Sequence, residues 1–230
     1  MKFMNLIKKI VKKLKFFFDF LVISSLKGKN KFSYIYKNSY WQNKINGSKS
    51  GSGSNDSSTK NITHELNKFI YEKKIKSILD IPCGDWNWMK KINLDNISYL
   101  GCDIVDEVIS ENKRNFSSNN IKFETKDIIS DKLPDAELII IRDLLVHLED
   151  KDILNFINNI KRSRFNFIAI TSYDHTLQNS KGTVDDNWRA LKLTIEPFNL
   201  REPDLKLDDS CDDTEDEKFK KLFVWKNDIN

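Results

Sequence analysis

Residues 77–89 have the sequence SILDIPCGDWNWM, in which a short apolar run ends in an acid and passes into a loop. A run of this length that is bounded by turn residues is typical of a buried β-strand. Gly84 lies in the loop, and because glycine has no Cβ it lets a ligand approach the backbone closely. The segment therefore predicts a strand whose carboxyl end carries a ligand-binding loop.

Further apolar runs follow, and amphipathic segments with helical periodicity separate them. The predicted strands are 97–104, 121–127, 136–143 and 165–172, and the predicted helices include 105–116 and 153–160. Strands that are apolar on both faces and alternate with helices indicate a parallel sheet covered on both sides. Residues 205–210 and 221–226 add a terminal antiparallel pair. The predicted fold is α/β, with a doubly wound, mostly parallel seven-stranded sheet and an antiparallel edge strand.

Acidic residues stand at the ends of the predicted strands. Ligands of such sheets bind beyond the carboxyl ends of the strands. Asp80 ends the first strand, and Asp103 ends the second about 20 residues further on, where a carboxylate accepts hydrogen bonds from both hydroxyls of a ribose. The alternative role for Asp103 is to cap the following helix. The spacing favours a site for a ligand that contains a ribose.

Three segments taken in order resemble motifs of the class I S-adenosylmethionine-dependent methyltransferases. They are the loop SILDIPCGDWNWM, the segment YLGCDIV and the segment IIIRDLLVHL. The resemblance rests on an ordered series at or just after strand ends, namely Asp80, Gly84, Asp103, Asp127 and Asp143. It is incomplete, because Gly84 is the middle one of the family's three loop glycines and Pro82 and Trp86 stand in the outer places. The implied fold is the Rossmann-like methyltransferase fold.

More narrowly, the chain resembles small bacterial methyltransferases of unassigned substrate that often occur beside sugar-modifying enzymes. Their features correspond here to SKSGSGS (48–54), DIPCGDWNWM (80–89), RDLLVHL (142–148), NWR (187–189), PFNL (197–200) and LFVW (222–225). This resemblance covers roughly residues 32–227. It implies that the Ser/Gly stretch folds over the cofactor, whereas its composition alone indicates a flexible linker.

The resemblance implies S-adenosylmethionine as the cofactor. Asp80 is expected to hold the methionine amino group, directly or through water, Asp103 the ribose hydroxyls, and Asp127 the adenine amino group. Ile104 and Ile128 are expected on the two faces of the adenine, unless both are ordinary core residues. The complete expected set of cofactor-binding residues is Asp80, Pro82, Cys83, Gly84, Asp85, Asp103, Ile104, Asp127 and Ile128.

Asp143 and His147 are the candidate catalytic residues, because they lie where the transferred methyl group is expected to emerge. They are four residues apart and share a face if this segment is helical. A histidine titrates near neutral pH, so His147 is the candidate general base; the alternatives are a structural histidine and a helix-capping Asp143. Trp188 and Arg189 are candidate substrate residues, since an arginine binds carboxylates or phosphates well.

Residues 1–31 form a predicted extension, 32–60 the covering or linker segment, and 61–230 the main domain. Within the extension, residues 1–26 combine helical apolar periodicity with a lysine-rich polar face. One interpretation is a helix on the surface of an anionic membrane, and another is a helix that packs on the domain or on a partner. A signal peptide lacks a clear cleavage site, and Asp19 interrupts the longest apolar run, which is too short to span a bilayer.

Composition bounds the remaining possibilities. Residues 1–49 hold 12 of the 38 basic residues but 1 of the 34 acidic ones, so the main domain is acidic and no nucleic-acid partner is expected. The three cysteines form no CxxC pair and are few, so neither a zinc site nor a disulfide framework is expected. This cysteine usage fits a cytoplasmic location best. If the N-terminal helix binds membrane, the location would be peripheral to the inner membrane face. The sequence does not indicate an oligomeric state.

The predicted function is methyl transfer from S-adenosylmethionine to oxygen on a sugar-containing or other small-molecule acceptor. A nicotinamide-dependent oxidoreductase is a weaker alternative, because Pro82 and Trp86 replace two glycines that a pyrophosphate needs. A non-catalytic binding module with the same fold is the other alternative. Neither the acceptor nor its reacting atom is identified by the sequence.

Overall fold

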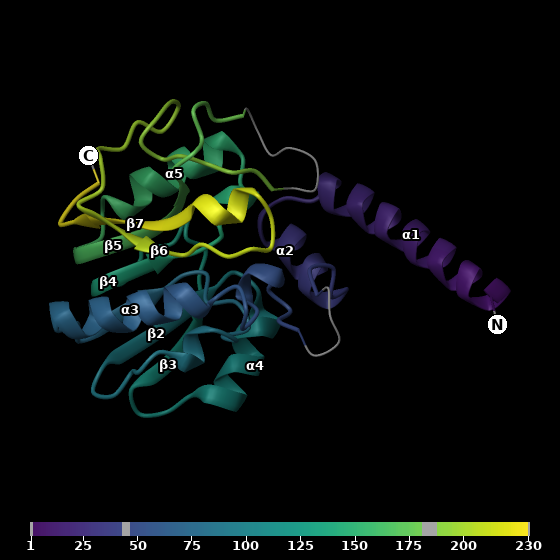
Figure 1. The fold of residues 1–230 in the computed structure, drawn as a ribbon. Coiled ribbons are helices and arrows are strands. Elements are labelled where there is room, and N and C mark those ends of the chain that lie inside the picture. The colour runs from purple at the N-terminus through teal and green to yellow at the C-terminus, as the bar shows by residue number, and fades with distance from the viewer. Residues whose placement is uncertain (1, 43–46, 181–187, 230) are drawn as a thin grey trace.

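A seven-stranded sheet forms the centre of the computed structural model, which describes residues 2–42, 47–180 and 188–229 (Figure 1). The strand order is β3-β2-β1-β4-β5-β7-β6. The strands are β1 (Ser77–Asp80), β2 (Ser98–Asp103), β3 (Ile121–Thr125), β4 (Ala136–Ile141), β5 (Phe165–Tyr173), β6 (Leu205–Asp208) and β7 (Lys220–Lys226). The predicted mostly parallel sheet is confirmed.

The antiparallel strand lies one position inside the edge. β7 pairs antiparallel with both β5 and β6, so that β6 forms the edge of the sheet. The other neighbouring strands pair in parallel. All five parallel strands therefore direct their carboxyl ends toward the same edge of the sheet, where ligands of such folds bind.

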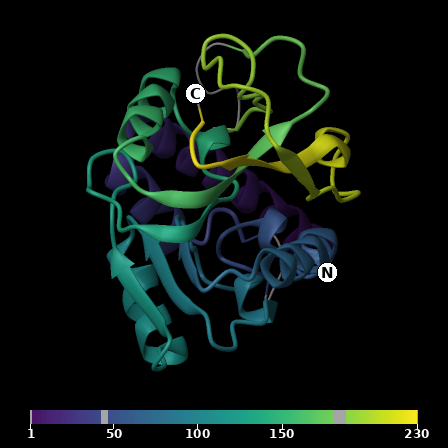
Figure 2. The same ribbon diagram turned by 90° about the vertical axis from the view of Figure 1, so that its left-hand side faces the viewer.

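Helices cover both faces of the sheet, as the apolar strands require (Figure 2). The helices are α1 (Lys2–Ser25), α2 (Gly28–Lys37), α3 (Lys60–Lys73), α4 (Asp106–Phe116) and α5 (Asp150–Ile160). Leu79 packs in one apolar cluster with Phe156 of α5, whereas its neighbour Ile78 packs in the other with Leu66 of α3. Alternate strand residues thus serve opposite layers. Within the described residues, no helix has the length and apolar character needed to cross a bilayer.

Two boundaries differ from those expected. The segment after β4 forms a short 3-10 turn, η3 (Leu145–His147), and α5 begins only at Asp150. Asp143 adopts a left-handed φ of 55°, which a right-handed helix does not accommodate. The condition under which Asp143 and His147 would share the face of an α-helix is therefore not met. In addition, α2 crosses the domain boundary expected after residue 31.

Candidate functional site

The loop after β1 is fixed to the end of β2. Gly84 has a φ of 53°, and its N–H donates to the Asp103 carboxylate over 3.1 Å. The N–H of Val105 donates to the other oxygen of Asp103 over 3.0 Å. Asp103 is buried, so these two donors compensate for part of the water that its carboxylate loses. The loop and the acid predicted from the sequence therefore form one unit.

Residues 47–54, here called the covering segment, are bound onto this loop. The Ser48 hydroxyl lies 2.9 Å from both carboxylate oxygens of Asp85, and the Lys49 N–H donates to Asp85 over 2.7 Å. The Ser50 hydroxyl accepts a hydrogen bond from the Asp85 N–H at 3.0 Å and lies 2.7 Å from the Tyr36 hydroxyl. These contacts exclude the flexible-linker interpretation for residues 47–54.

Gly84→Ala is expected to release the covering segment. A Cβ at this position would overlap the Ser50 hydroxyl and lie 3.1 Å from that of Tyr36, in addition to the strain of a positive φ, which costs about 1 kcal/mol. We expect faster tryptic cleavage after Lys49 and a loss of more than about 1 kcal/mol in the free energy of unfolding.

The matched control is Gly28→Ala, because Gly28 also has a positive φ but no atom lies within 4 Å of its added Cβ. Gly28→Ala is expected to lower the free energy of unfolding through backbone strain but to leave tryptic cleavage after Lys49 unchanged. Equal cleavage of the two variants would mean that Gly84 does not hold the covering segment in place.

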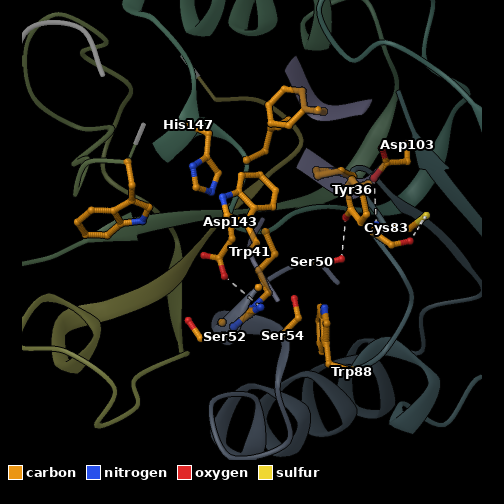
Figure 3. Close-up of a pocket in the computed structure, with 18 of the residues that line it drawn as sticks. Tyr36, Trp41, Ser50, Ser52, Ser54, Cys83, Trp88, Asp103, Asp143 and His147 are labelled. Carbon is orange, nitrogen blue, oxygen red and sulfur yellow. Dashed lines mark hydrogen bonds and ion pairs between the residues drawn. The ribbon is translucent and has the colours of Figure 1, made fainter. Parts of the chain in front are cut away.

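Two adjoining cavities open beyond the carboxyl ends of the parallel strands. The larger has a volume of about 220 Å³ and lies between the covering segment and the loops after β1 and β4 (Figure 3). The smaller has a volume of about 110 Å³ and lies between the loop after β3 and the start of α2. Five residues line both cavities, which therefore adjoin each other and are together called the groove here: Phe32, Pro82, Ile104, Leu144 and His147.

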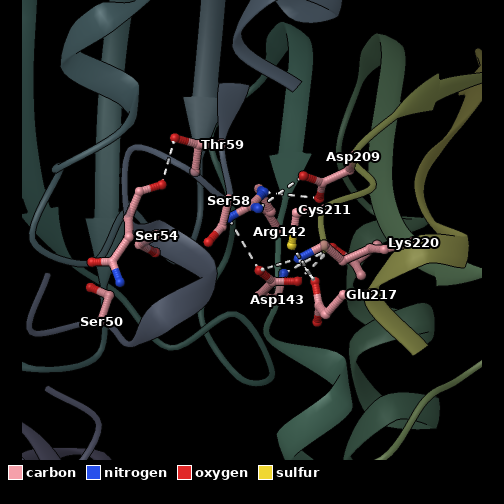
Figure 4. A network of polar contacts seen from close by, with 12 residues as sticks. Ser50, Ser54, Ser58, Thr59, Arg142, Asp143, Asp209, Cys211, Glu217 and Lys220 are labelled. Atoms are coloured by element: carbon pink, nitrogen blue, oxygen red, sulfur yellow. Dashed lines mark hydrogen bonds and ion pairs between the residues drawn. The ribbon is translucent and has the colours of Figure 1, made fainter. Parts of the chain in front are cut away.

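A network of five charged side chains flanks the larger cavity (Figure 4). Arg142 binds Asp209 through two hydrogen bonds of 2.9 Å and lies 3.1 Å from Asp143. Lys220 contacts Asp143 at 3.4 Å and also pairs with Glu217. Burial alone would raise the pKa of Asp143, but Arg142, Lys220 and His147 outweigh it and hold that pKa below its ordinary value. Asp143 is therefore a fixed anion at neutral pH.

His147 lines the groove at the end of the 3-10 turn. Its ring lies 4.7 Å from the ring of Trp41, measured between centroids, and its carbonyl oxygen accepts a hydrogen bond from Lys31. Asp143 lines the same cavity, and the two side chains are close enough to influence each other's charge. The turn thus brings the two candidate catalytic residues together by a route other than the helix expected.

Comparisons place this arrangement among known folds. No family model and no curated protein matches the sequence. Among solved structures, the N-methyltransferase NodS from Bradyrhizobium japonicum WM9 matches 75% of this chain and 98% of its own, with a TM-score of 0.52 and 17% identity. PigF with SAH matches 74% of this chain at a TM-score of 0.52 and 14% identity. Human N-acetylserotonin methyltransferase in complex with SAM matches 88% of this chain, with a TM-score of 0.52 and 12% identity.

The chain has the class I methyltransferase fold. It spans only 55% of PigF and 57% of the human enzyme, in contrast to nearly all of NodS. The groove runs along the carboxyl ends of β1, β2 and β3.

Of the residues predicted to bind a cofactor, Pro82, Cys83, Gly84 and Asp103 line the larger cavity, and Ile104 lines both cavities. The smaller cavity is lined by Asp127 and Ile128. Two expected residues are absent from both linings. Asp85 binds the covering segment instead. Asp80 is buried and accepts a hydrogen bond of 2.6 Å from the Tyr99 hydroxyl, and burial raises its pKa to about 7.

The two candidate substrate residues differ in position. Trp188 lines the larger cavity and packs edge-on against Tyr173. Arg189 is buried, and its guanidinium binds the carbonyl oxygens of Ser180 and Leu148 and the carboxylate of Asp150. These contacts give Arg189 a structural role, so the expectation that it binds an acceptor does not fit the structure.

Several lining residues of the groove were not identified as site residues from the sequence. They are Phe32, Tyr36, Arg142 and Glu217. Arg142 lies within a segment that resembles a family motif, so adjacency to the motif residues was the available signal. Tyr36 and Glu217 carry no such signal, because their place depends on how distant segments fold back.

Proposed function

We propose that this chain is an S-adenosylmethionine-dependent methyltransferase that methylates a hydroxyl group of a sugar-containing or other small-molecule acceptor. The observation that carries the proposal is the position of Asp103. Its buried carboxylate lines the larger cavity, and the residue that follows it, Ile104, lines both. A ribose bound at Asp103 would therefore have room on both sides for the rest of the cofactor.

The residues present fit this cofactor. Ile104, Ile128 and Asp127 supply apolar walls and one acceptor in the smaller cavity, which suits an adenine and its amino group. The larger cavity continues from Asp103 beneath the covering segment, which suits the methionine part. Together the two volumes reach the lower end of the roughly 300–1,000 Å³ typical of small-molecule sites.

When bound, S-adenosylmethionine supplies a methyl group that is already activated by its sulfonium, so the protein mainly aligns the acceptor and moves a proton. His147 is the group that accepts the hydroxyl proton, since it lines the groove shared by both cavities. Asp143 remains ionised beside it and stabilises the protonated imidazole. Trp41, Trp88 and Trp188 line the same cavity, and such flat apolar surfaces suit the ring of a sugar.

Cofactor binding tests the proposal directly. The protein is expected to bind S-adenosylhomocysteine in calorimetry, and Asp103→Asn is expected to weaken binding by roughly ten- to a hundredfold, because charged hydrogen bonds contribute about 1.5–3 kcal/mol each. Asp95→Asn, a change at an exposed acid away from the groove, is the control and should leave the affinity unchanged. Failure of the wild-type protein to bind would favour the non-catalytic module, and preferential binding of NADH would favour the oxidoreductase.

The same titration should depend on pH. Burial raises the pKa of Asp103 to about 6, although the N–H groups of Val105 and Gly84 lower it in part. Only the ionised carboxylate accepts hydrogen bonds from both ribose hydroxyls, so affinity should fall by up to about tenfold per pH unit as pH drops below 6. Asp103→Asn should remove this dependence. An affinity that is unchanged between pH 7 and pH 5 in the wild-type protein would contradict the ribose assignment.

A further inference from the structure

Helix α1 extends away from the sheet and its covering helices (Figure 1). Seven apolar residues on α1, here called the apolar stripe, recur at spacings of three and four and so lie on one side of the helix: Ile7, Ile10, Val11, Leu14, Phe17, Phe18 and Leu21. Each is between 44% and 63% exposed. Among the side chains that the structure describes, α1 holds eight of the twelve large apolar ones that are exposed. Such a concentration marks an interaction surface.

The opposite side of α1 attaches the helix to the domain. Ile23 is fully buried, and Asp19 is buried beneath Lys15 and the Tyr34 hydroxyl, which donates to it over 2.9 Å. Phe16 stacks on Tyr40 at 5.2 Å between centroids. At 3.6 residues per turn these positions point away from the apolar stripe. The helix therefore packs on its own domain through this side, whereas the apolar stripe does not contribute to that packing.

Positive charge accompanies the apolar stripe. The helix contains six lysines, Lys2, Lys8, Lys9, Lys12, Lys13 and Lys15, and one acid, Asp19. Lys13 and Lys15 are exposed, and their register places them on opposite flanks of the stripe, although the ammonium group of Lys15 also pairs with Asp19 at 2.6 Å. A lysine that flanks an apolar face extends its ammonium group to the lipid headgroups while its methylenes lie among apolar atoms.

We propose that α1 lies along the surface of an anionic membrane, with its apolar stripe among the acyl chains and its lysines at the headgroups. Charge complementarity favours this occupant over a second copy of the chain, since two copies of α1 would bring twelve lysines together. It also favours lipid over an apolar protein groove, because the lysines on both flanks would need acids to meet them there. The proposal is independent of the proposed function, because it involves no cofactor.

The attachment of α1 also fixes where the groove would lie. Ser24, Leu26 and Lys27, at and just beyond the end of α1, line the smaller cavity. A membrane-bound α1 would therefore hold one end of the groove close to the lipid surface. Acceptors carried by lipid or dissolved near the headgroups would then be the ones concentrated at the site.

Flotation of the full chain with lipid vesicles tests the proposal. We expect binding to vesicles rich in phosphatidylglycerol that exceeds binding to phosphatidylcholine vesicles by at least about tenfold and weakens as salt is added. Leu14→Ser/Phe18→Ser removes two exposed side chains of the stripe and should lower binding by about a hundredfold. The matched control is Tyr71→Ser/Leu177→Ser, which removes two exposed apolar side chains elsewhere and should bind as the wild type does.

Three results would overturn the proposal. They are failure of the wild-type protein to float with anionic vesicles, equal binding to neutral ones, and equal loss of binding in both double variants. Light scattering measures whether the chain forms a dimer, in which a second copy of the chain would cover the apolar stripe. A dimer that Leu14→Ser/Phe18→Ser dissociates, in a protein that does not float, would assign the stripe to self-association.

Discussion

Replacing Arg142 with methionine is expected to lower the free energy of unfolding by about 3–5 kcal/mol, because it leaves a buried carboxylate without its partner. Arg142 and Asp209 are both buried and joined by two hydrogen bonds of 2.9 Å. Burial raises the pKa of Asp209 in spite of Arg142 and Lys220, which indicates that these partners do not fully compensate for the water that the carboxylate has lost. The loss should appear in urea unfolding and as a lower melting temperature, by roughly 2–4 °C per kcal/mol.

A second variant distinguishes an unpaired charge from a packing defect. Arg142→Met/Asp209→Leu removes both charges, and because such pairs are often replaceable by apolar side chains, most of the stability should return. Arg162→Met, at an exposed arginine, is the control for the change of residue type. A double variant as unstable as Arg142→Met would show that the guanidinium acts through its packing, for example on the Trp88 ring at 5.1 Å.

The instability of Arg142→Met should also depend on pH. Without Arg142 the pKa of Asp209 would rise further above its value in the unfolded chain. A carboxyl group whose pKa is raised on folding favours the folded state most at low pH, and this contribution is lost as pH rises through the raised pKa. The difference from wild type should therefore be smaller at pH 5 than at pH 8. A larger difference at pH 5 would contradict the sign of this argument.

The strands and the acids at their ends were predictable from the sequence because both follow from local pattern. A strand such as Ile78–Asp80 that is buried on both faces is an apolar run, and a parallel sheet brings the carboxyl ends of such runs together whatever the loops do. Asp103, which ends β2, lines the larger cavity for this reason. The same argument does not fix side-chain direction, and Asp80, at the end of its strand, points to Tyr99 rather than into the groove.

The contacts made by the covering segment were not predictable from composition. Ser48 and Ser50 are attached to Asp85, which lies 35 or more residues away in the sequence. A Ser/Gly stretch lacks an apolar face, so its pattern is that of a linker. Only the resemblance to family motifs suggested that it folds over the groove, and the hydroxyl contacts supply the physical reason that it does.

The charged network depends on topology that the sequence does not encode locally. Arg142 follows β4. Asp209 directly follows β6, and Lys220 is the first residue of β7, which pairs antiparallel with β6. Insertion of β7 between β5 and β6 brings these residues together. From the sequence, Asp209 stands near the end of the predicted strand 205–210 and beside an acid-rich loop, and the pattern does not indicate that it is buried. The contacts of Arg189 have the same origin, since two of its three partners, Leu148 and Asp150, lie about 40 residues away in the sequence.

Replacing His147 with phenylalanine is expected to lower the rate of methyl transfer by about 10²–10⁴-fold, the usual contribution of a general base, without weakening cofactor binding. Phenylalanine keeps a ring against Trp41, so the packing at 4.7 Å is retained while the proton acceptor is lost. The measurement is transfer of a labelled methyl group to sugars and other hydroxyl acceptors, alongside calorimetry with S-adenosylhomocysteine. His64→Phe, at an exposed histidine, is the control.

The pH profile separates a base from a structural histidine. If His147 accepts the proton, the wild-type rate should rise with pH through the neutral range in which imidazoles deprotonate, and His147→Phe should lose that rise. Asp143 stays ionised throughout, since Arg142 and Lys220 hold its pKa below the ordinary value, so it adds no step of its own. A variant that is slower but keeps the wild-type profile would assign the proton transfer to another group and leave His147 a positioning role beside Trp41.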